Sequence, residues 1–433
     1  MGYPSLVMAT VRPFHALRYT ASAGEISSLV APPYDVLSAV QRDEYAAKNP
    51  HNVVWLTLPE GAQDDRSQFV KYARSASRLA EWRRDGFLAL TGERGLYRYR
   101  QSFVHPITKE SQTRTQLMVI LKVEPYEKGV VLPHEQTFPK HKQDRLRLLE
   151  ATRTHLESIY GLYRDENNLV QARIEQADWK NFVDIKTEDG VTQTLDVCTD
   201  PDHVAGITDA FDAEKIWIAD GHHRYETALN FRNEQGEKPG EIAEDYMLIS
   251  LSSIRDEGLA LLPTHRIVNH WTLTPELAEQ QLQRFFNVRR VGNHELPNLV
   301  REHGQPGTTA FGIALPGGAG LLATLEDPRA ALDWVDYQGS ERLKLLDVTV
   351  LHNVILEKAF GIEGLDRLEF TRDASEAVSR VAESNNTAAI LTNPPSVEDM
   401  RVIAERGEKM PQKSTYYYPK LLSGLLFFSL DDF

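Results

Sequence analysis

The stretch IADGHHRYETAL, residues 218–229, places one carboxylate, two imidazoles and one guanidinium around a single glycine. The apolar residues Ile216 to Ile218 predict a short strand, and the residues after the glycine predict a helix that begins near His223. A helix N-terminus exposes unpaired N–H groups and the positive end of the helix dipole. The stretch therefore predicts a strand, a glycine turn and a helix that together bind an anion such as phosphate.

Each polar residue of this turn has a predicted role. Gly221 lets the backbone approach a phosphate closely, while His222, His223 and Arg224 supply hydrogen-bond donors. Asp220 is predicted to act in catalysis as a metal ligand or as the partner of a ligand hydroxyl, because a bare carboxylate beside an anion is unfavourable. The alternative is structural: Asp220 caps the helix, and the histidines are packing or surface residues. A zinc site is less favoured, because the usual cysteine ligands are missing.

A second polar stretch, VLPHEQTFPKHKQDRL, covers residues 131–146. A glutamate in such a loop, here Glu135, can serve as a general base. Lys140 and Lys142 are predicted to hold phosphate charge. The alternative is a solvated charged loop in which Asp144 caps the following helix.

Three residues are predicted to contact the substrate. His134 and Thr137 flank the predicted base Glu135 in sequence. Asp35 lies in APPYDVL, residues 31–37, a proline-rigid loop whose carboxylate is expected to point into a cleft.

A third polar stretch, GEKMPQKSTYYYPK, covers residues 407–420. Its cations and hydroxyls at positions 413–415 and at Lys420 suit an anion, and Lys413 is the predicted phosphate contact. The three consecutive tyrosines either stack on a base or pack in the core, and the core role is the more usual one for aromatic residues in a strand.

The bulk composition limits the classes of protein to consider. A chain of 433 residues predicts two or three domains. The mixture of strand and helix patterns predicts an α+β class, and the chain is divided here into regions 1–128, 129–270 and 271–433. The formal charge of −14 argues against nucleic acid and anionic membranes as partners. A single cysteine fits a cytoplasmic location, and neither a signal peptide nor an apolar run of roughly 18 residues is evident. The sequence does not decide whether the protein forms a homo-oligomer.

Local sequence patterns predict several helices. Ser38 is the expected N-cap of a helix that ends near Pro50, and an amphipathic helix is expected to stop at Gly86. In residues 142–163 apolar side chains recur at helical spacing as far as Ile159, which predicts a helix.

Six blocks in order resemble a bacterial and archaeal family of unknown function numbered 1015. These blocks are APPYDVLS, LPHEQTFPKHKQDRL, ADGHHRYETAL, LLPTHRIV, LDVTVLHNVILEK and MPQKSTYYYPK. They span nearly the whole chain, but the family name implies no reaction.

Two of the blocks are also similar to segments of the ParB and sulfiredoxin-like superfamily, and within it to the ADP-dependent free serine kinases. Residues 132–135 resemble the early Pro-His-Glu-Glu-like segment of those kinases, and residues 220–224 resemble their Asp-Gly-x-His-Arg turn. The resemblance implies a ParB/sulfiredoxin-like core at 129–270, Glu135 as the base and the turn as the nucleotide site.

The resulting prediction is a phosphotransferase that moves a phosphoryl group from ADP or ATP, with Mg²⁺, to the hydroxyl of a small polar metabolite. The alternative is a nucleotide-binding regulatory switch of the same superfamily without turnover. A nuclease is disfavoured by the negative net charge.

Overall fold

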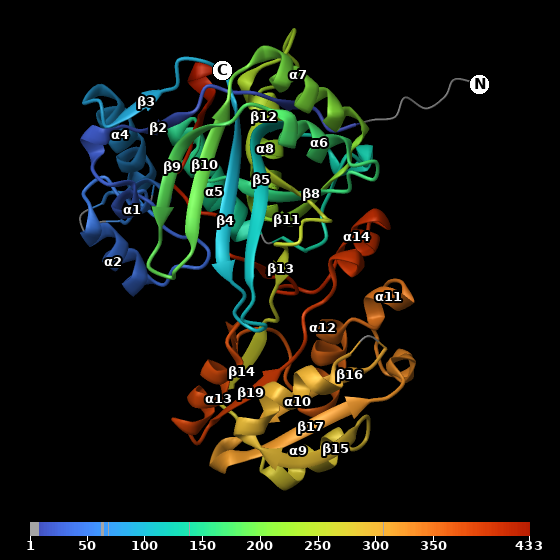
Figure 1. Cartoon of the computed structure of the whole chain (residues 1–433). Coiled ribbons are helices and arrows are strands. Elements are labelled where there is room, and N and C mark those ends of the chain that lie inside the picture. Colours follow the sequence, from blue (N-terminus) through green and yellow to red (C-terminus); the bar gives the residue numbers. More distant parts are fainter. Residues whose placement is uncertain (1–7, 62–64, 68, 138, 306) are drawn as a thin grey trace. The chain divides into compact units, whose positions relative to one another are not determined.

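The chain folds into two compact units, each built from helices and sheets (Figure 1). The computed structural model describes residues 8–61, 65–67, 69–137, 139–305 and 307–433, without the side chains of residues 139–141. Unit 1 comprises Met1–Pro133, Thr137–Ala260 and Pro419–Phe433. Unit 2 comprises His134–Gln136 and Leu261–Tyr418. The α+β class predicted from the sequence is confirmed.

Unit 1 is organised around one mixed sheet. Its strands follow the order β6-β11-β8-β12-β5-β4-β10-β9, and β1 pairs with β5. In that order the bounds are Val131–Leu132, Ile216–Asp220, Ile159–Tyr163, Tyr246–Ser253, Ser111–Lys122, Leu96–Val104, Thr192–Cys198 and Lys180–Lys186, with β1 at Val11–Arg12. Because β5 pairs directly with β12, the predicted regions 1–128 and 129–270 share one sheet.

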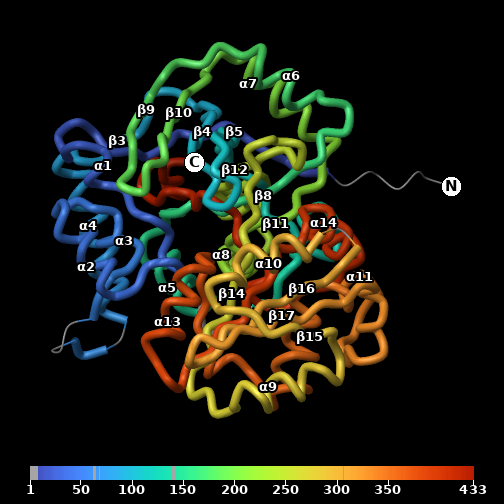
Figure 2. The backbone as a smooth tube through the Cα atoms, turned by 60° about the horizontal axis from the view of Figure 1, so that its bottom comes forward, coloured from blue at the N-terminus to red at the C-terminus, as the bar shows by residue number. Residues whose placement is uncertain are grey.

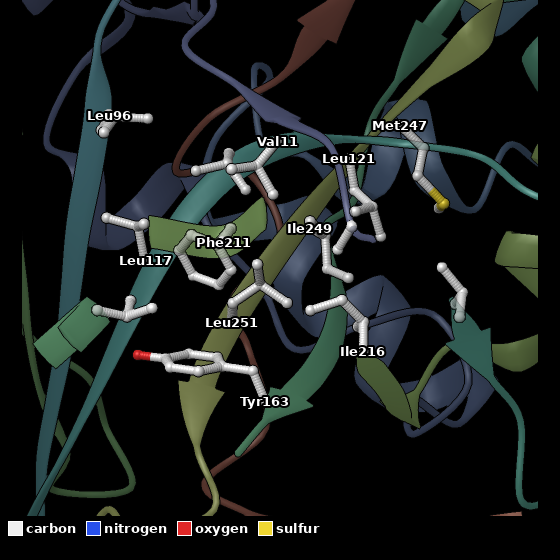
Figure 3. Close-up of a cluster of buried hydrophobic side chains, with 14 of the residues drawn as sticks. Val11, Leu96, Leu117, Leu121, Tyr163, Phe211, Ile216, Met247, Ile249 and Leu251 are labelled. Carbon is white, nitrogen blue, oxygen red and sulfur yellow. The ribbon is translucent and has the colours of Figure 1, made fainter. Parts of the chain in front are cut away.

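Alternate residues of the central strands form one apolar cluster on one face of the sheet. On β5 and β12 the cross-strand pairs Leu117–Leu251 and Leu121–Met247 lie in one apolar cluster. Figure 3 shows these four side chains gathered with Phe211. Alternate residues of a strand point to the same face, so a one-residue slip would remove this whole set from the core.

Helices surround the sheet of unit 1, and α5 packs against both α4 and α8. The helices of this unit are α1 (Ile26–Leu29), α2 (Ala39–Lys48), α3 (Val54–Thr57), α4 (Val70–Arg84), α5 (Pro139–Thr152), α6 (Leu169–Gln176), α7 (Pro201–Ala210) and α8 (His222–Glu234). The helix predicted after Ser38 is confirmed, with a Ser38–Gln41 capping box. The helix predicted to stop at Gly86 is α4, and Gly86 has a φ of 78°.

The helix predicted over residues 142–163 is wrong in its second half. α5 ends at Thr152, and Arg153 adopts a left-handed φ of 45°. Ile159 instead begins β8, which pairs with β11 and β12. Sheet pairing therefore overrides the apolar spacing in this segment.

The C-terminal segment is an integral part of unit 1. Figure 2 shows the red end of the chain among the blue and cyan N-terminal elements of this unit. Leu17 and Phe427 exchange two backbone hydrogen bonds of 3.0 and 2.9 Å. β21 (Phe428–Ser429) pairs with β7 (Thr154–His155), and a further short pair joins β2 (Leu17–Tyr19) to β3 (Leu88–Leu90).

Unit 2 is an antiparallel sheet with helices on both faces. Its strand order is β15-β17-β16-β19-β14-β18. The bounds are Asn287–Gly292, Ala319–Leu325, Thr309–Ala314, Thr387–Leu391, His265–Asn269 and Leu368–Thr371. The neighbours Ile267 and Val268 of β14 belong to two different apolar clusters, as opposite faces of a strand require.

The helices of unit 2 complete these two clusters. α9 and the π-helix join the cluster of Val268, while α10 and α13 join the cluster of Ile267. The helices are α9 (Pro275–Leu282), α10 (Leu296–His303), α11 (Glu341–Lys344), α12 (Asp347–Val350), the π-helix Leu351–Ala359, α13 (Ala374–Ala382) and α14 (Val397–Glu405). The chain enters the unit along β13 (Ala260–Leu261) and leaves it along β20 (Tyr417–Tyr418). Among the residues that the structure describes, none of the helices combines the length and apolar character needed to cross a membrane.

The substitution Gly161→Ala tests the packing of β8. A Cβ atom there would lie 2.9 Å from side-chain carbons of Ile216, Ile249 and Leu251, closer than carbon atoms normally approach. We expect a loss of about 1–3 kcal/mol in the free energy of unfolding, measured by urea denaturation. Gly92→Ala is the matched control, because a Cβ at Gly92 meets no atom within 4 Å. Equal stability of the two variants would contradict the packing described for β8.

Candidate functional site

The turn between β11 and α8 has the predicted form. β11 ends at Asp220, and α8 begins at His222, one residue before the predicted start. The N-cap is Gly221, which has no side chain and adopts the left-handed conformation with φ 94° and ψ 27°. Asp220 therefore precedes the N-cap position, and its carboxylate faces two cations.

Two cations face the carboxylate of Asp220. Lys420 Nζ lies 3.2 Å from Asp220 Oδ1, and Arg224 Nη2 lies 3.8 Å from Asp220 Oδ2. The Asp220 side chain is 23% exposed, and each cation is 11% exposed. Burial acts to raise the pKa of Asp220, but Lys420 and Arg224 outweigh it and lower the pKa to about 2. The Asp220 carboxylate is therefore ionised at neutral pH.

Arg224 is fixed by hydrogen bonding and by surrounding carboxylates. Its Nη1 donates a hydrogen bond of 2.9 Å to the carbonyl oxygen of Ser158. Burial acts to lower the pKa of Arg224, but Glu157, Asp220 and Asp35 together raise it. Asp35, predicted from the sequence as a substrate contact, thus lies within the electrostatic field of Arg224.

The loop that carries Asp35 is anchored beside this cluster. The Tyr34 N–H and the Ser423 hydroxyl both donate to Glu157 Oε1, at 3.1 and 2.8 Å. The guanidinium carbon of Arg145 lies 4.1 Å from the centre of the Tyr34 ring, and that of Arg224 lies 5.9 Å from it. Burial raises the pKa of Tyr34 to about 12 despite these cations, so the phenol is protonated at neutral pH.

A pocket opens beside Arg224. Its charged lining is Arg145, Glu157 and Arg224. The remaining lining residues are Leu148, Leu149, Thr154, His155, Leu156 and Thr227. Apolar walls with a few charged groups are typical of sites for small organic ligands.

The two histidines of the turn lie in the first turn of α8. His222 is buried, and its charged form would stabilise the Asp220 carboxylate. His223 is half-buried, and its carbonyl accepts a hydrogen bond of 2.7 Å from the Thr227 hydroxyl. Both imidazoles therefore belong to the same helix end as Arg224.

Glu226 engages two of the predicted ligand-binding residues. Its Oε2 accepts 2.6 and 2.8 Å hydrogen bonds from the Thr137 hydroxyl and from Lys142 Nζ. Tyr126 lies 3.5 Å from Oε1 of the same carboxylate. Lys142 and Thr137 are thereby tied to the second turn of α8. Lys140, the other predicted lysine, lies outside the described side chains.

A second polar cluster belongs to unit 2. Glu135 Oε1 accepts a 3.1 Å hydrogen bond from the Lys413 backbone N–H. The carbonyl of His134 accepts a 2.7 Å bond from the Met410 N–H, and His134 Nε2 lies 3.0 Å from Thr415 Oγ1. The two sequence stretches that contain Glu135 and Lys413 are therefore brought together.

Arg266 contacts this second cluster and is almost fully buried. It lies 3.1 Å from His352 Nε2 and donates to the Lys413 carbonyl at 3.4 Å. Burial lowers the pKa of Arg266 to about 9, although Glu135 acts in the opposite direction. The side chain remains a cation at neutral pH and provides a positive charge near Glu135.

The predicted site residues therefore fall into two groups. Those of unit 1 are Asp35, Thr137, Lys142, Asp220, Gly221, His222, His223 and Arg224. Those of unit 2 are His134, Glu135 and Lys413. That Glu135 acts at the turn of unit 1 stays a prediction.

Sequence reasoning missed part of the turn cluster. The sequence indicated Lys420 as a cation that could bind an anion, but nothing in its position indicated Asp220 as its partner. Arg145 lies in the polar stretch 131–146 but was given no role, and no motif marked Glu157.

The turn does not provide a preformed metal site. Both oxygens of Asp220 already face cations, and these would repel Mg²⁺. In the part of the chain that the structure describes, no three His, Cys, Asp or Glu side chains gather as a ligand set. These residues therefore do not fit the predicted role of Asp220 as a metal ligand.

Comparison with known proteins gives a family but no curated relative. A family model described as "Protein of unknown function (DUF1015)" matches residues 11–349. No curated protein matches the chain.

Solved structures give weak similarities. A free serine kinase in complex with AMP is 12% identical, with 69% of this chain and 86% of that chain covered and a TM-score of 0.35. A conserved hypothetical protein from Pyrococcus furiosus is 12% identical, with 73% and 97% covered and the same TM-score. SbnI with a C-terminal truncation, from Staphylococcus aureus, is 10% identical, with 71% and 85% covered and a TM-score of 0.35.

Gly221→Ala tests the geometry of the turn. A Cβ atom at Gly221 would lie 2.6 Å from Ile159 Cγ2 and 3.2 Å from Arg224 Nη2. Gly236→Ala is the matched control, because Gly236 also has positive φ but open space around it. We expect the control to lose about 1–2 kcal/mol of unfolding free energy from backbone strain alone. Gly221→Ala should lose a further 1–3 kcal/mol or so from overpacking in chemical denaturation. Equal losses would show that the turn tolerates a side chain.

Proposed function

The chain belongs to the DUF1015 family of proteins of unknown function, and from its site we propose a nucleotide-dependent phosphotransferase that acts on the hydroxyl of a small polar metabolite. The observation that carries this proposal is the position of Arg224. Its side chain, which is 11% exposed, lies in the first turn of α8, three residues after the left-handed Gly221, and lines a pocket. A cation and exposed N–H groups at a helix N-terminus are suited to phosphate.

The pocket beside Arg224 has three leucines as well as charged residues in its lining. We propose that it receives part of a nucleotide whose phosphates lie at the turn. ADP and ATP are the proposed donors, and Arg224, His222 and His223 are the proposed phosphate contacts.

Glu135 is the proposed general base for the acceptor hydroxyl. As the hydroxyl oxygen forms its bond to the terminal phosphorus, Glu135 accepts the proton and the bond from phosphorus to the nucleotide breaks. Anchoring of Glu135 Oε1 by the Lys413 N–H supports a fixed carboxylate. His134, Thr137 and Asp35 are the proposed substrate contacts, and Mg²⁺ is proposed to accompany the nucleotide phosphates without a ligand from Asp220.

The proposal includes a ParB/sulfiredoxin-like core at residues 129–270 and a cytoplasmic location. The core rests on the similarity of residues 132–135 and 220–224 to segments of ADP-dependent free serine kinases. A single, buried cysteine, Cys198, supports the location.

Arg224→Ala tests nucleotide binding. Loss of a charge-assisted contact should weaken ADP binding by roughly 1.5–3 kcal/mol, as measured by isothermal titration calorimetry. Arg164→Ala is the control, because Arg164 is exposed and pairs only with Glu166 among the ion pairs of the described residues. A folded Arg224→Ala variant with unchanged ADP affinity would remove Arg224 from the site.

Glu135→Gln tests the base. Glutamine keeps the shape and an oxygen that can accept the Lys413 N–H, but it cannot take the proton. We expect near-normal ADP affinity and turnover reduced by about 10²–10⁴, measured as phosphorylated product from a panel of small hydroxy metabolites. Glu127→Gln, at an exposed carboxylate, is the control.

Two outcomes of this experiment would change the proposal. If the wild-type chain binds nucleotide tightly but phosphorylates no acceptor in the panel, the regulatory switch replaces the kinase. If Glu135→Gln turns over as fast as wild type, Glu135 is not the base even where the kinase activity stands.

A further inference from the structure

Unit 1 contains another cavity, which shares no lining residue with the pocket beside Arg224. Its volume is about 130 Å³, whereas a single water molecule needs roughly 10–15 Å³. The lining comes from β2 and the following 3₁₀ turn, from α1, from β9 and from the C-terminal segment. α1 packs against β9 in this unit (Figure 1). The cavity is therefore large enough for a small organic molecule.

Arg18 is the charged residue among the described residues that line this cavity. It is half-buried, and its guanidinium carbon lies 4.4 Å from the centre of the Phe182 ring. Within the described part of the chain, no carboxylate pairs with Arg18 and no polar group accepts a hydrogen bond from its guanidinium. Arg18 therefore brings to the lining N–H donors that no described residue uses.

The backbone and the aromatic partner of Arg18 are both held in place by the fold. β2, which contains Arg18, pairs with β3. The neighbouring Leu17 exchanges two backbone hydrogen bonds with Phe427 of the C-terminal segment. Phe182 in turn packs against Tyr97, with ring centres 5.9 Å apart. Because these groups are fixed before a ligand arrives, less ordering entropy is lost on binding.

The rest of the lining indicates the kind of ligand. Ile26, Val183 and Leu425 contribute apolar residues, and Tyr19 and Phe182 are aromatic. Water can satisfy the guanidinium, but apolar surface is stabilised only when apolar atoms cover it. A guanidinium binds a carboxylate through paired hydrogen bonds. Its single charge balances one carboxylate, but not the roughly −1.5 to −2 of a phosphomonoester at neutral pH.

We propose that this cavity is a binding site for a small monocarboxylate with an apolar body, and that Arg18 holds the carboxylate group. The apolar part of the acid lies among Ile26, Val183 and Leu425. The inference does not rest on the proposed nucleotide site, because none of the residues assigned to that site lines this cavity.

Arg18→Met is the first test, with butyrate and benzoate titrated against the full chain and followed by ligand-observed NMR. We expect saturable binding to the wild-type chain. Arg18→Met should weaken it at least about tenfold, because it removes a charge-assisted hydrogen bond and keeps an apolar stem beside Phe182. Arg18→Lys should restore part of the affinity. Arg164→Met is the control, since Arg164 is exposed and lies outside the lining.

Benzamide separates recognition of the charge from apolar packing. It keeps the ring of benzoate without the charge, so it should bind the wild-type chain at least about tenfold more weakly and should not respond to Arg18→Met. Equal affinity for benzamide and benzoate would overturn the proposal, as would benzoate binding that Arg18→Met leaves unchanged or the absence of saturable binding of both acids. Inorganic phosphate that competes with benzoate at equal concentration would overturn the carboxylate assignment.

Ala21→Leu tests the location of the site. Ala21 is an exposed residue of the lining, and leucine there would occupy part of the cavity without changing its charge. Benzoate affinity should fall in this variant. Ala47→Leu, at an exposed position of α2 outside the lining, should leave it unchanged. A folded Ala21→Leu variant with wild-type benzoate affinity would show that the acid binds elsewhere and would overturn the site.

Discussion

The pairing of Asp220 with Lys420 and Arg224 is the interaction on which the candidate site depends. A carboxylate removed from water costs several kcal/mol unless cations or donors compensate it. Here the compensation comes from α8, one turn beyond the carboxylate, and from the returning C-terminal segment. The end of a strand, the start of a helix and a distant segment are thereby fixed to one another by charge.

The C-terminal return makes this arrangement possible, and it also completes the fold of unit 1. Ala31 and Ser423 exchange two backbone hydrogen bonds, and Phe427 joins the apolar cluster of the N-terminal helices. The Ser423 hydroxyl donates to Glu157, the same carboxylate that anchors the Asp35 loop. Packing and site formation are therefore coupled, because the residues that place Lys420 are continuous with those that close the core.

Structure that depends on neighbouring residues was predicted from the sequence, whereas contacts between residues far apart in the chain were not. The strand, glycine turn and helix at Asp220 follow from an apolar run and from backbone preferences of adjacent residues. The helix predicted through Leu156 to Ile159 ended early, because the left-handed Arg153 ends α5 and the following strand pairs within the sheet. The types of residue at the turn predicted an anion site. The partner Lys420 could not be predicted, because only the tertiary fold brings it to Asp220.

The net charge of the chain also bears on the candidate site. The chain carries a formal charge of −14, which at long range repels phosphate. Salt screens such long-range repulsion over about 10 Å, whereas contacts in a partly buried site are screened far less. Short-range contacts such as those of Lys420 and Arg224 with Asp220 therefore outweigh the distant charges in fixing the geometry of the turn.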